Sequence, residues 1–99
     1  MEDLAAVHPG RVLREEFLAP VRLTPQALAE RIGLSEEDVS RVVSECGGMT
    51  AELAIRLARF FGTSSDFWME LQASHELARA RTELKEVLPK IEPYATAAS

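Results

Sequence analysis

The stretch from Leu28 to Val43 constrains the fold of this chain most strongly. Apolar residues recur at helical spacing on both sides of Gly33, and glycine suits a tight turn because it adopts positive φ without a Cβ penalty. Ala29 is small enough for a second helix to cross close to the first. The positions expected to face inward are Leu28, Ile32, Leu34, Val39 and Val42. The stretch therefore predicts two short helices joined by a turn, a helix-turn-helix motif, whose second helix usually lies in the DNA major groove.

Size and charge limit the classes of protein that the chain can form. Its 99 residues suit one domain, and an apolar content of 46% suffices for a small core. The formal charge of −5 argues against binding of nucleic acid through bulk positive charge. Cys46 is the only cysteine in the sequence, so no internal disulfide can form. This fits either a reducing compartment or a thiol without a role. We find no secretion signal and no run long enough for a membrane span, and we expect a cytoplasmic protein without a membrane partner.

Helix start and stop signals predict an all-α fold of about five helices. Pro20 and Pro89 are expected to stop the first and the last helix. The expected N-caps are Thr24, Ser35, Thr50 and Thr63. The expected helices cover about residues 10–18, 25–32, 36–45, 51–61 and a long stretch from 64 towards 88. We expect one domain over residues 9–88, between a flexible lead (1–8) and a disordered tail (89–99).

The third expected helix supplies the surface that would read DNA. If Val39, Val42 and Val43 face inward, the rotation of 100° per residue places Glu37, Arg41 and Ser44 on the outward face. Arg41 could then pair with guanine, and Glu37 could accept a hydrogen bond from cytosine N4. Ser40 or Ser44 could contact a base or a phosphate. The predicted DNA-binding residues are Thr24, Gln26, Glu37, Ser40, Arg41 and Ser44.

The same segment is acidic, which conflicts with DNA binding. Residues 24–49 hold two arginines against five carboxylates, a net charge of −3, and three of these carboxylates open the third helix. Cations for the phosphates would have to come from Arg11, Arg14, Arg22, Arg56 or Arg59. Two interpretations stay open. Either this helix contacts DNA despite its acidic start, or the carboxylates oppose the helix dipole in solvent and have little role in DNA binding.

The remaining chemistry-bearing residues predict structure rather than catalysis. Phe67 and Trp68 favour core packing, with an exposed half at an interface as the alternative. His8 is expected to be a local structural residue at a turn, and neither it nor His75 has further ligands at metal spacing. No catalytic triad and no phosphate-binding glycine loop is visible, so we expect no enzyme, no metal, no cofactor and no small-molecule substrate.

The last helix has apolar residues beyond those that the core is expected to use. They predict a homodimer, since a small core benefits from an added interface. The predicted dimer-interface residues are Leu77, Leu84, Val87 and Leu88.

Four segments together resemble one family. They are residues 8–20 with the start His8-Pro9-Gly10, residues 28–43, residues 54–64, and residues 66–72 with Asp66-Phe67-Trp68. Over roughly residues 7–80 the chain is similar to HigA-type antitoxins, the plasmid-maintenance antidote group of the Xre-like helix-turn-helix proteins. The resemblance implies an all-α, lambda-repressor-like fold, commonly as a homodimer. It also implies repression of the chain's own operon through operator DNA, and a toxin partner that cuts mRNA on ribosomes. A nuclease needs positive charge to approach RNA, and this chain is acidic, so opposite charges would favour their association. We therefore expect a small basic toxin.

Three departures from the family's pattern bear on DNA binding. Acidic residues occupy 36–38, where polar or basic residues are usual, and Ser-Glu-Cys-Gly at 44–47 replaces Asn-Gly-Lys-Arg. Pro25 replaces a glutamine and lacks an N–H for a phosphate. Two alternatives therefore stand beside the antitoxin-repressor: a toxin-neutralising protein with weak or lost DNA binding, and a stand-alone Xre-like repressor without a toxin. An enzyme is the least supported class.

Overall fold

The computed structural model describes residues 7–94, which form helices and no strands. The all-α expectation is confirmed. The outer parts of the expected lead and tail, residues 1–6 and 95–99, lie outside the described residues. Val7 and His8 were expected in a flexible lead, but both are buried, so the packed part of the chain already includes them.

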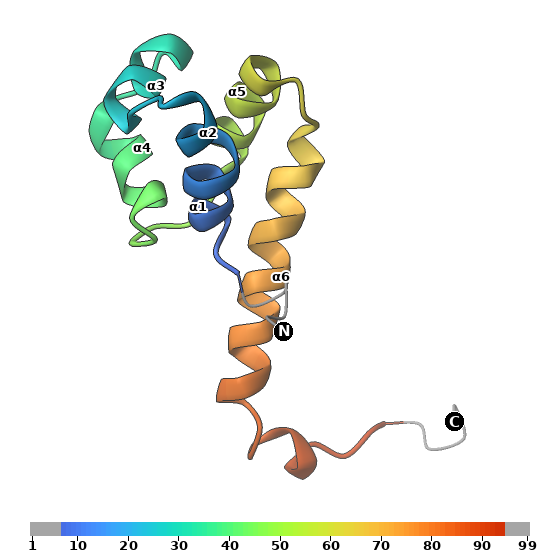
Figure 1. Cartoon of the computed structure of the whole chain (residues 1–99). Helices are drawn as coiled ribbons and strands as arrows, with labels where there is room; N and C mark the ends of the chain where they lie inside the picture. Colours follow the sequence, from blue (N-terminus) through green and yellow to red (C-terminus); the bar gives the residue numbers. More distant parts are fainter. Residues whose placement is uncertain (1–6, 95–99) are drawn as a thin grey trace.

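The first helix is one continuous run over residues 9–21, in three segments: α1 (Pro9–Val12), the π-helical η2 (Leu13–Leu18) and α2 (Ala19–Val21). Figure 1 shows it in blue, beside the upper part of the long helix. His8 is its N-cap, because its Nδ1 accepts a hydrogen bond from the Gly10 N–H at 2.8 Å. His8 therefore has the local structural role expected for it.

The prediction that Pro20 stops this helix is wrong. The Ala19 N–H bonds to the Arg14 carbonyl oxygen, five residues back, so the chain is in the wider π register just before the proline. Pro20 then lies in the first turn of α2, where a missing N–H is tolerated. The run ends instead at Arg22, which has left-handed backbone with φ 57°.

The predicted helix-turn-helix unit forms from α3 (Pro25–Ile32) and α4 (Glu36–Val43). Helix α3 has its predicted bounds, whereas α4 ends at Val43 rather than near residue 45. The Oγ1 of Thr24 and the Oγ of Ser35 each accept a hydrogen bond from the backbone N–H three residues on, at 3.0 and 3.1 Å. Gly33 ends α3 in left-handed conformation, with φ 79°. These local signals place both helices and the turn between them.

Helix α5 (Ala51–Phe61) also follows its predicted bounds, but the start of α6 (Ser65–Glu83) does not. Thr63 was expected to cap α6. Ser64 does so instead, through its Oγ and the Phe67 N–H. The Thr63 hydroxyl accepts a hydrogen bond from the Trp68 indole N–H at 2.8 Å, so a tertiary contact uses the first of two adjacent capping residues.

Helix α6 ends at Glu83 rather than near Leu88. Its last turns project beyond the bundle and residues 81–94 are all exposed, so no core stabilises a further extension. The chain therefore turns at Leu84 and continues into the short 3-10 helix η3 (Leu88–Lys90).

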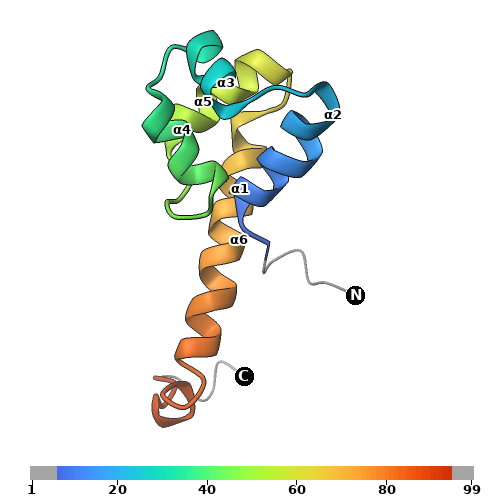
Figure 2. The same ribbon diagram turned by 60° about the vertical axis from the view of Figure 1, so that its left-hand side comes forward.

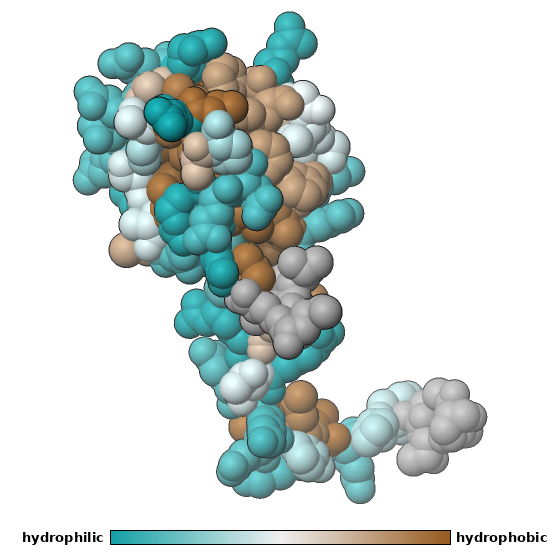
Figure 3. Space-filling model, in the orientation of Figure 1, coloured by the Kyte–Doolittle hydropathy of each residue, from teal (hydrophilic) through white to brown (hydrophobic). Residues whose placement is uncertain are grey.

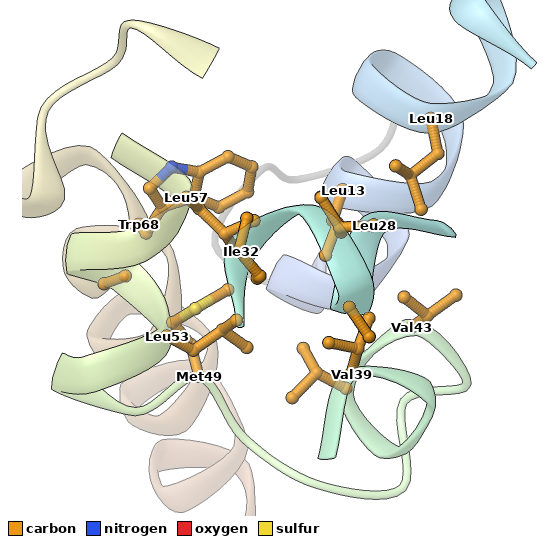
Figure 4. Close-up of a cluster of buried hydrophobic side chains, with 13 residues drawn as sticks. Leu13, Leu18, Leu28, Ile32, Val39, Val43, Met49, Leu53, Leu57 and Trp68 are labelled. Carbon is orange, nitrogen blue, oxygen red and sulfur yellow. The ribbon is translucent and has the colours of Figure 1, made fainter. Parts of the chain in front are cut away.

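The core lies where the helix-turn-helix unit, the first helix and α5 meet around α6. Leu13, Leu28 and Val39 form one side, with Leu57 and Trp68 on the other, and all five have no exposed side-chain surface (Figure 4). The expectation of a core aromatic is confirmed for Trp68, whereas Phe67 is half-buried. Figure 2 shows the lower half of α6 leaving this bundle as a stalk. Within the described residues, no helix is both long and apolar enough to cross a membrane.

Candidate nucleic-acid interface

Helix α4 presents the face that its sequence predicts. Val39, Val42 and Val43 are buried, at 0%, 3% and 8% exposure. The opposite face carries the exposed side chains of Glu37, Arg41 and Ser44. The structure therefore brings these three predicted DNA-binding residues together on one solvent-facing strip.

The other three predicted DNA-binding residues, Ser40, Thr24 and Gln26, lie outside this strip. Ser40 is half-buried on the flank of α4. Thr24 and Gln26 are exposed at the start of α3, where the Thr24 hydroxyl already caps the helix. The Ser44 hydroxyl donates to the Arg41 carbonyl oxygen at 3.3 Å, which leaves the oxygen of that hydroxyl facing solvent as an acceptor.

Arg41 lies at the edge of a cleft of about 420 Å³ between α4 and the start of α5. Thr50, the N-cap of α5, and Asp38 and Glu52 also line this cleft. The aliphatic part of Arg41 packs over Gly47, since a Cβ at Gly47 would lie 2.5 Å from the Arg41 Cδ. Within residues 7–94 its guanidinium forms no ion pair, so it is available to a ligand.

Carboxylates dominate the start of this helix. Glu36, Glu37 and Asp38 fill the first turn of α4 and are all exposed. At this end of the helix they oppose the positive end of the helix dipole and stabilise the helix. Their negative charge would repel the phosphates of any DNA that approached this end of the helix, and so would weaken the sequence-independent part of the affinity.

Two of the five arginines considered as phosphate contacts, Arg14 and Arg56, bind the ends of other helices, and a third, Arg11, pairs with Glu15. Arg56 donates from Nη1 to the carbonyl oxygen of Ile32, the last residue of α3, at 2.7 Å. Its Nη2 pairs with Glu52 at 2.9 Å. Arg14 serves the end of α4 in the same way. Both side chains bind the ends of helices rather than extend towards a ligand. No local sequence pattern indicates either contact, since each spans more than twenty residues.

A second polar cluster lies on the other side of the loop that follows α4, in a cleft of about 390 Å³. His8 and His75 meet there edge to face, with ring centroids 5.0 Å apart. Burial lowers the pKa of His8, and the neighbouring His75 and Arg79 lower it further, whereas Glu45 and the Gly47 backbone raise it. Within residues 7–94, no group of three or more His, Cys, Asp and Glu side chains could hold a metal ion.

These features define a class. An all-helical bundle, a glycine turn between two short crossing helices, and a second helix with an exposed polar face are the parts of a helix-turn-helix DNA-binding domain.

Comparison with known proteins narrows this class. No family model matches the chain. It is 36% identical over 94 residues to virulence-associated protein I of Dichelobacter nodosus, covering 95% of this chain and 86% of that protein. It is 34% identical over 87 residues to antitoxin HigA-1 of Vibrio cholerae, covering 88% and 82%. Antitoxin HigA of Pseudomonas aeruginosa, solved with the higBA promoter, matches with a TM-score of 0.87 and 42% identity, over 91% of this chain and 99% of that one.

The chain belongs to the HigA-type antitoxin family of helix-turn-helix regulators. The family resemblance and the helix-turn-helix fold are thereby confirmed. Other relatives are named as antitoxins or as helix-turn-helix transcriptional regulators. Which residues of this chain contact DNA, and which form a dimer, stay predictions.

Proposed function

We propose that this chain is the antitoxin of a type II toxin-antitoxin pair. It acts in the cytoplasm as a homodimer, neutralises a ribosome-dependent mRNA-cleaving toxin by binding it, and represses its own operon. The observation that carries the proposal is the match along nearly the whole chain to an antitoxin solved with its promoter, together with the exposed polar face of α4.

The geometry of α4 supports operator binding. In helix-turn-helix proteins the second helix enters the major groove with its polar face towards the bases. Here that face holds Arg41 as its single cation, with Ser44 beside it and Glu37 one turn earlier. Arg41 can donate two hydrogen bonds to a guanine, and Glu37 can accept one from a cytosine.

Charge supports the toxin partner. The chain carries −5 overall, and a nuclease that acts on ribosome-bound RNA needs positive charge to approach its substrate. Opposite charges speed and orient association. We therefore propose a small basic toxin encoded beside this chain's gene.

Two experiments test the two activities. For the toxin, the small basic protein encoded next to this chain is expressed alone and with the chain in excess, and growth and mRNA cleavage are followed. With the chain in excess, we expect growth to recover and mRNA cleavage to stop. Persistent toxicity would contradict the antitoxin assignment.

For DNA, a mobility-shift assay uses the region upstream of the chain's own gene. Arg41→Ala should weaken specific binding by roughly one to two orders of magnitude, because one good base contact is worth roughly 1–3 kcal/mol. Arg81→Ala removes the same charge from α6, far from α4, and is the matched control. Equal binding by all three proteins would exclude Arg41 as a base contact.

The acidic first turn of α4 favours a second candidate function, toxin neutralisation with weak or lost DNA binding. Mobility-shift assays on the free chain and on its complex with the toxin separate the two. Relief of toxicity without an operator shift in either state supports this second candidate. A third candidate, a stand-alone repressor, predicts an operator shift and no toxin gene nearby.

A further inference from the structure

A buried amide in the middle of α6 holds the loop that follows the candidate recognition helix. Gln72 is only 8% exposed, and both ends of its side chain are used. Its Oε1 accepts a hydrogen bond from the Met49 backbone N–H at 2.6 Å, and its Nε2 donates to Glu76 Oε2 at 2.7 Å. A buried amide costs stability unless it is hydrogen-bonded, so this position is specialised for the contact with the loop.

The loop over residues 44–50 connects α4 to α5 and lies directly against this amide. Met49 is buried and precedes Thr50, the N-cap of α5. A Cβ added at Gly48 would lie 3.0 Å from the Gln72 amide, so the backbone there passes close to Gln72 because glycine leaves the space.

The same loop supports the side chain that we propose reads a base. The aliphatic part of the Arg41 side chain packs over the backbone of Gly47, the residue before Gly48. Gly47 and the residue before it also donate backbone hydrogen bonds to the Arg41 carbonyl oxygen, at 3.0 and 2.9 Å. A continuous set of contacts therefore runs from Gln72 through residues 47–49 to Arg41.

We propose that Gln72 is a positioning residue for operator binding. It fixes the loop 44–50, and through the loop it fixes the direction of Arg41 and the place of the α5 N-terminus relative to α4. The inference rests on the operator binding proposed above, and it adds a residue on α6, outside the helix-turn-helix unit, to the determinants of that binding.

The test compares the full-length wild type with Gln72→Leu, which keeps the volume and removes both hydrogen bonds. Operator affinity, measured on the DNA upstream of the chain's own gene, should fall about tenfold, roughly the loss of one base contact. Affinity for unrelated DNA should not change, because no cation is removed. Hydrogen exchange at the Met49 amide should be faster.

A variant in which the amide and the carboxylate exchange positions distinguishes positioning of the loop from a general effect on stability. Gln72→Glu alone places two carboxylates side by side and should also weaken operator binding. Gln72→Glu combined with Glu76→Gln restores an acceptor for the Met49 N–H and a donor between the two side chains, and should recover affinity to within about twofold of wild type. Trp68→Phe, which loses the bond to Thr63 and lowers stability away from the loop, should bind the operator normally below its melting temperature.

Each outcome decides the inference. Equal operator affinity for wild type and Gln72→Leu overturns it and leaves operator binding standing. A pair variant that folds but stays weak also overturns it, and this holds even if Gln72→Leu fails to fold. A wild-type chain that shifts no operator DNA overturns the proposed operator binding, and the inference with it.

Discussion

The guanidinium group of Arg14 donates a hydrogen bond to the backbone carbonyl oxygen of Val43, with 2.6 Å between Nη1 and the oxygen. Val43 is the last residue of α4, so the bond satisfies a carbonyl that has no partner within the helix. The positive charge also lies at the negative end of the helix dipole. Arg14 reaches Glu45 as well, at 3.0 Å, and so ties the first helix to both sides of the α4 terminus.

Removing this contact should loosen the end of α4. We expect Arg14→Ala to lower the free energy of unfolding by about 1–2 kcal/mol, mainly through the lost hydrogen bond to Val43. The exposed pair with Glu45 adds little, because solvent screens it. Urea unfolding measures the change. Arg59→Ala removes an exposed arginine from α5 and is the control, with an expected change within about 0.5 kcal/mol. A loss no larger for Arg14→Ala than for Arg59→Ala would contradict the role given to Arg14.

A pH dependence follows from the N-cap of the first helix. Neutral His8 accepts the Gly10 N–H at Nδ1, and protonation removes this acceptor. Burial first, then His75 and Arg79, lower the pKa of His8 below its ordinary value of 6.5, against Glu45 and the Gly47 backbone. The native state therefore binds the proton less readily than the unfolded chain does. The His8 contribution to stability is complete above pH 6.5, falls as the pH drops below 6.5, and levels off below the lowered pKa.

The measurement is urea unfolding at pH 7.5 and at pH 5.5 for the wild type and His8→Asn. Asparagine offers a side-chain oxygen as N-cap and does not titrate. The wild type should lose more stability between the two pH values than the variant does. An equal loss in both proteins would show that the pKa of His8 is the same in the native and the unfolded state, and would contradict the lowered pKa.

Local signals predicted most of the fold. Thr24, Ser35 and Thr50 each cap a helix as expected, and Gly33 and Gly62 each end one with positive φ. Such contacts span three or four residues and depend on the types of side chain alone, so a single sequence reveals them. For the same reason the exposed face of α4 follows from its three valines.

The errors arose where another backbone register or a tertiary contact overrides a local rule. Pro20 does not stop the first helix because that helix is in π register just before it. Thr63 does not cap α6 because the Trp68 indole uses its hydroxyl. The contacts of Arg14 and Gln72 span 29 and 23 residues and have no local pattern. A polar residue within the buried stripe of α6 was the one available signal for Gln72.

The proposed dimer contact gives a test on the C-terminal part of the chain. Leu77 lies on α6, whereas the other predicted interface residues, Leu84, Val87 and Leu88, follow its end. These four residues are 43–50% exposed, and apolar side chains gather below α6 in Figure 3. An apolar patch that is exposed in one copy often marks a protein–protein interface, and in a homodimer a second copy would bury it.

We expect a dimer mass for the wild type by light scattering at micromolar concentration, and a monomer mass for Leu84→Glu combined with Leu88→Glu. Ile55→Glu changes a residue on α5 that is 60% exposed and should leave the dimer intact. A monomeric wild type, or a double variant that stays dimeric, would rule out these residues as the dimer contact.

The carboxylates that open α4 provide the sharpest test of its role. Glu36→Gln together with Glu37→Gln removes two negative charges from the side of α4 that we propose faces DNA, and the side chains keep their size. Affinity for DNA of unrelated sequence should rise several-fold, because like charge no longer opposes the phosphates. The helix should lose roughly 0.3–1 kcal/mol per removed charge, since these carboxylates oppose the helix dipole. Fluorescence anisotropy with a labelled duplex measures the affinity, and urea unfolding measures the stability.

The matched control is Glu86→Gln with Glu92→Gln, which changes the net charge equally at two exposed positions beyond α6. If α4 faces DNA, the pair on α4 should raise affinity clearly more than the control pair, because phosphate repulsion falls off within a Debye length of about 10 Å at 0.1 M salt. The difference should shrink as salt is added. Equal effects of the two pairs would mean that net charge alone sets the affinity and that α4 does not approach DNA. Combined with unchanged binding by Arg41→Ala, that result would favour the toxin-neutralising protein without DNA recognition.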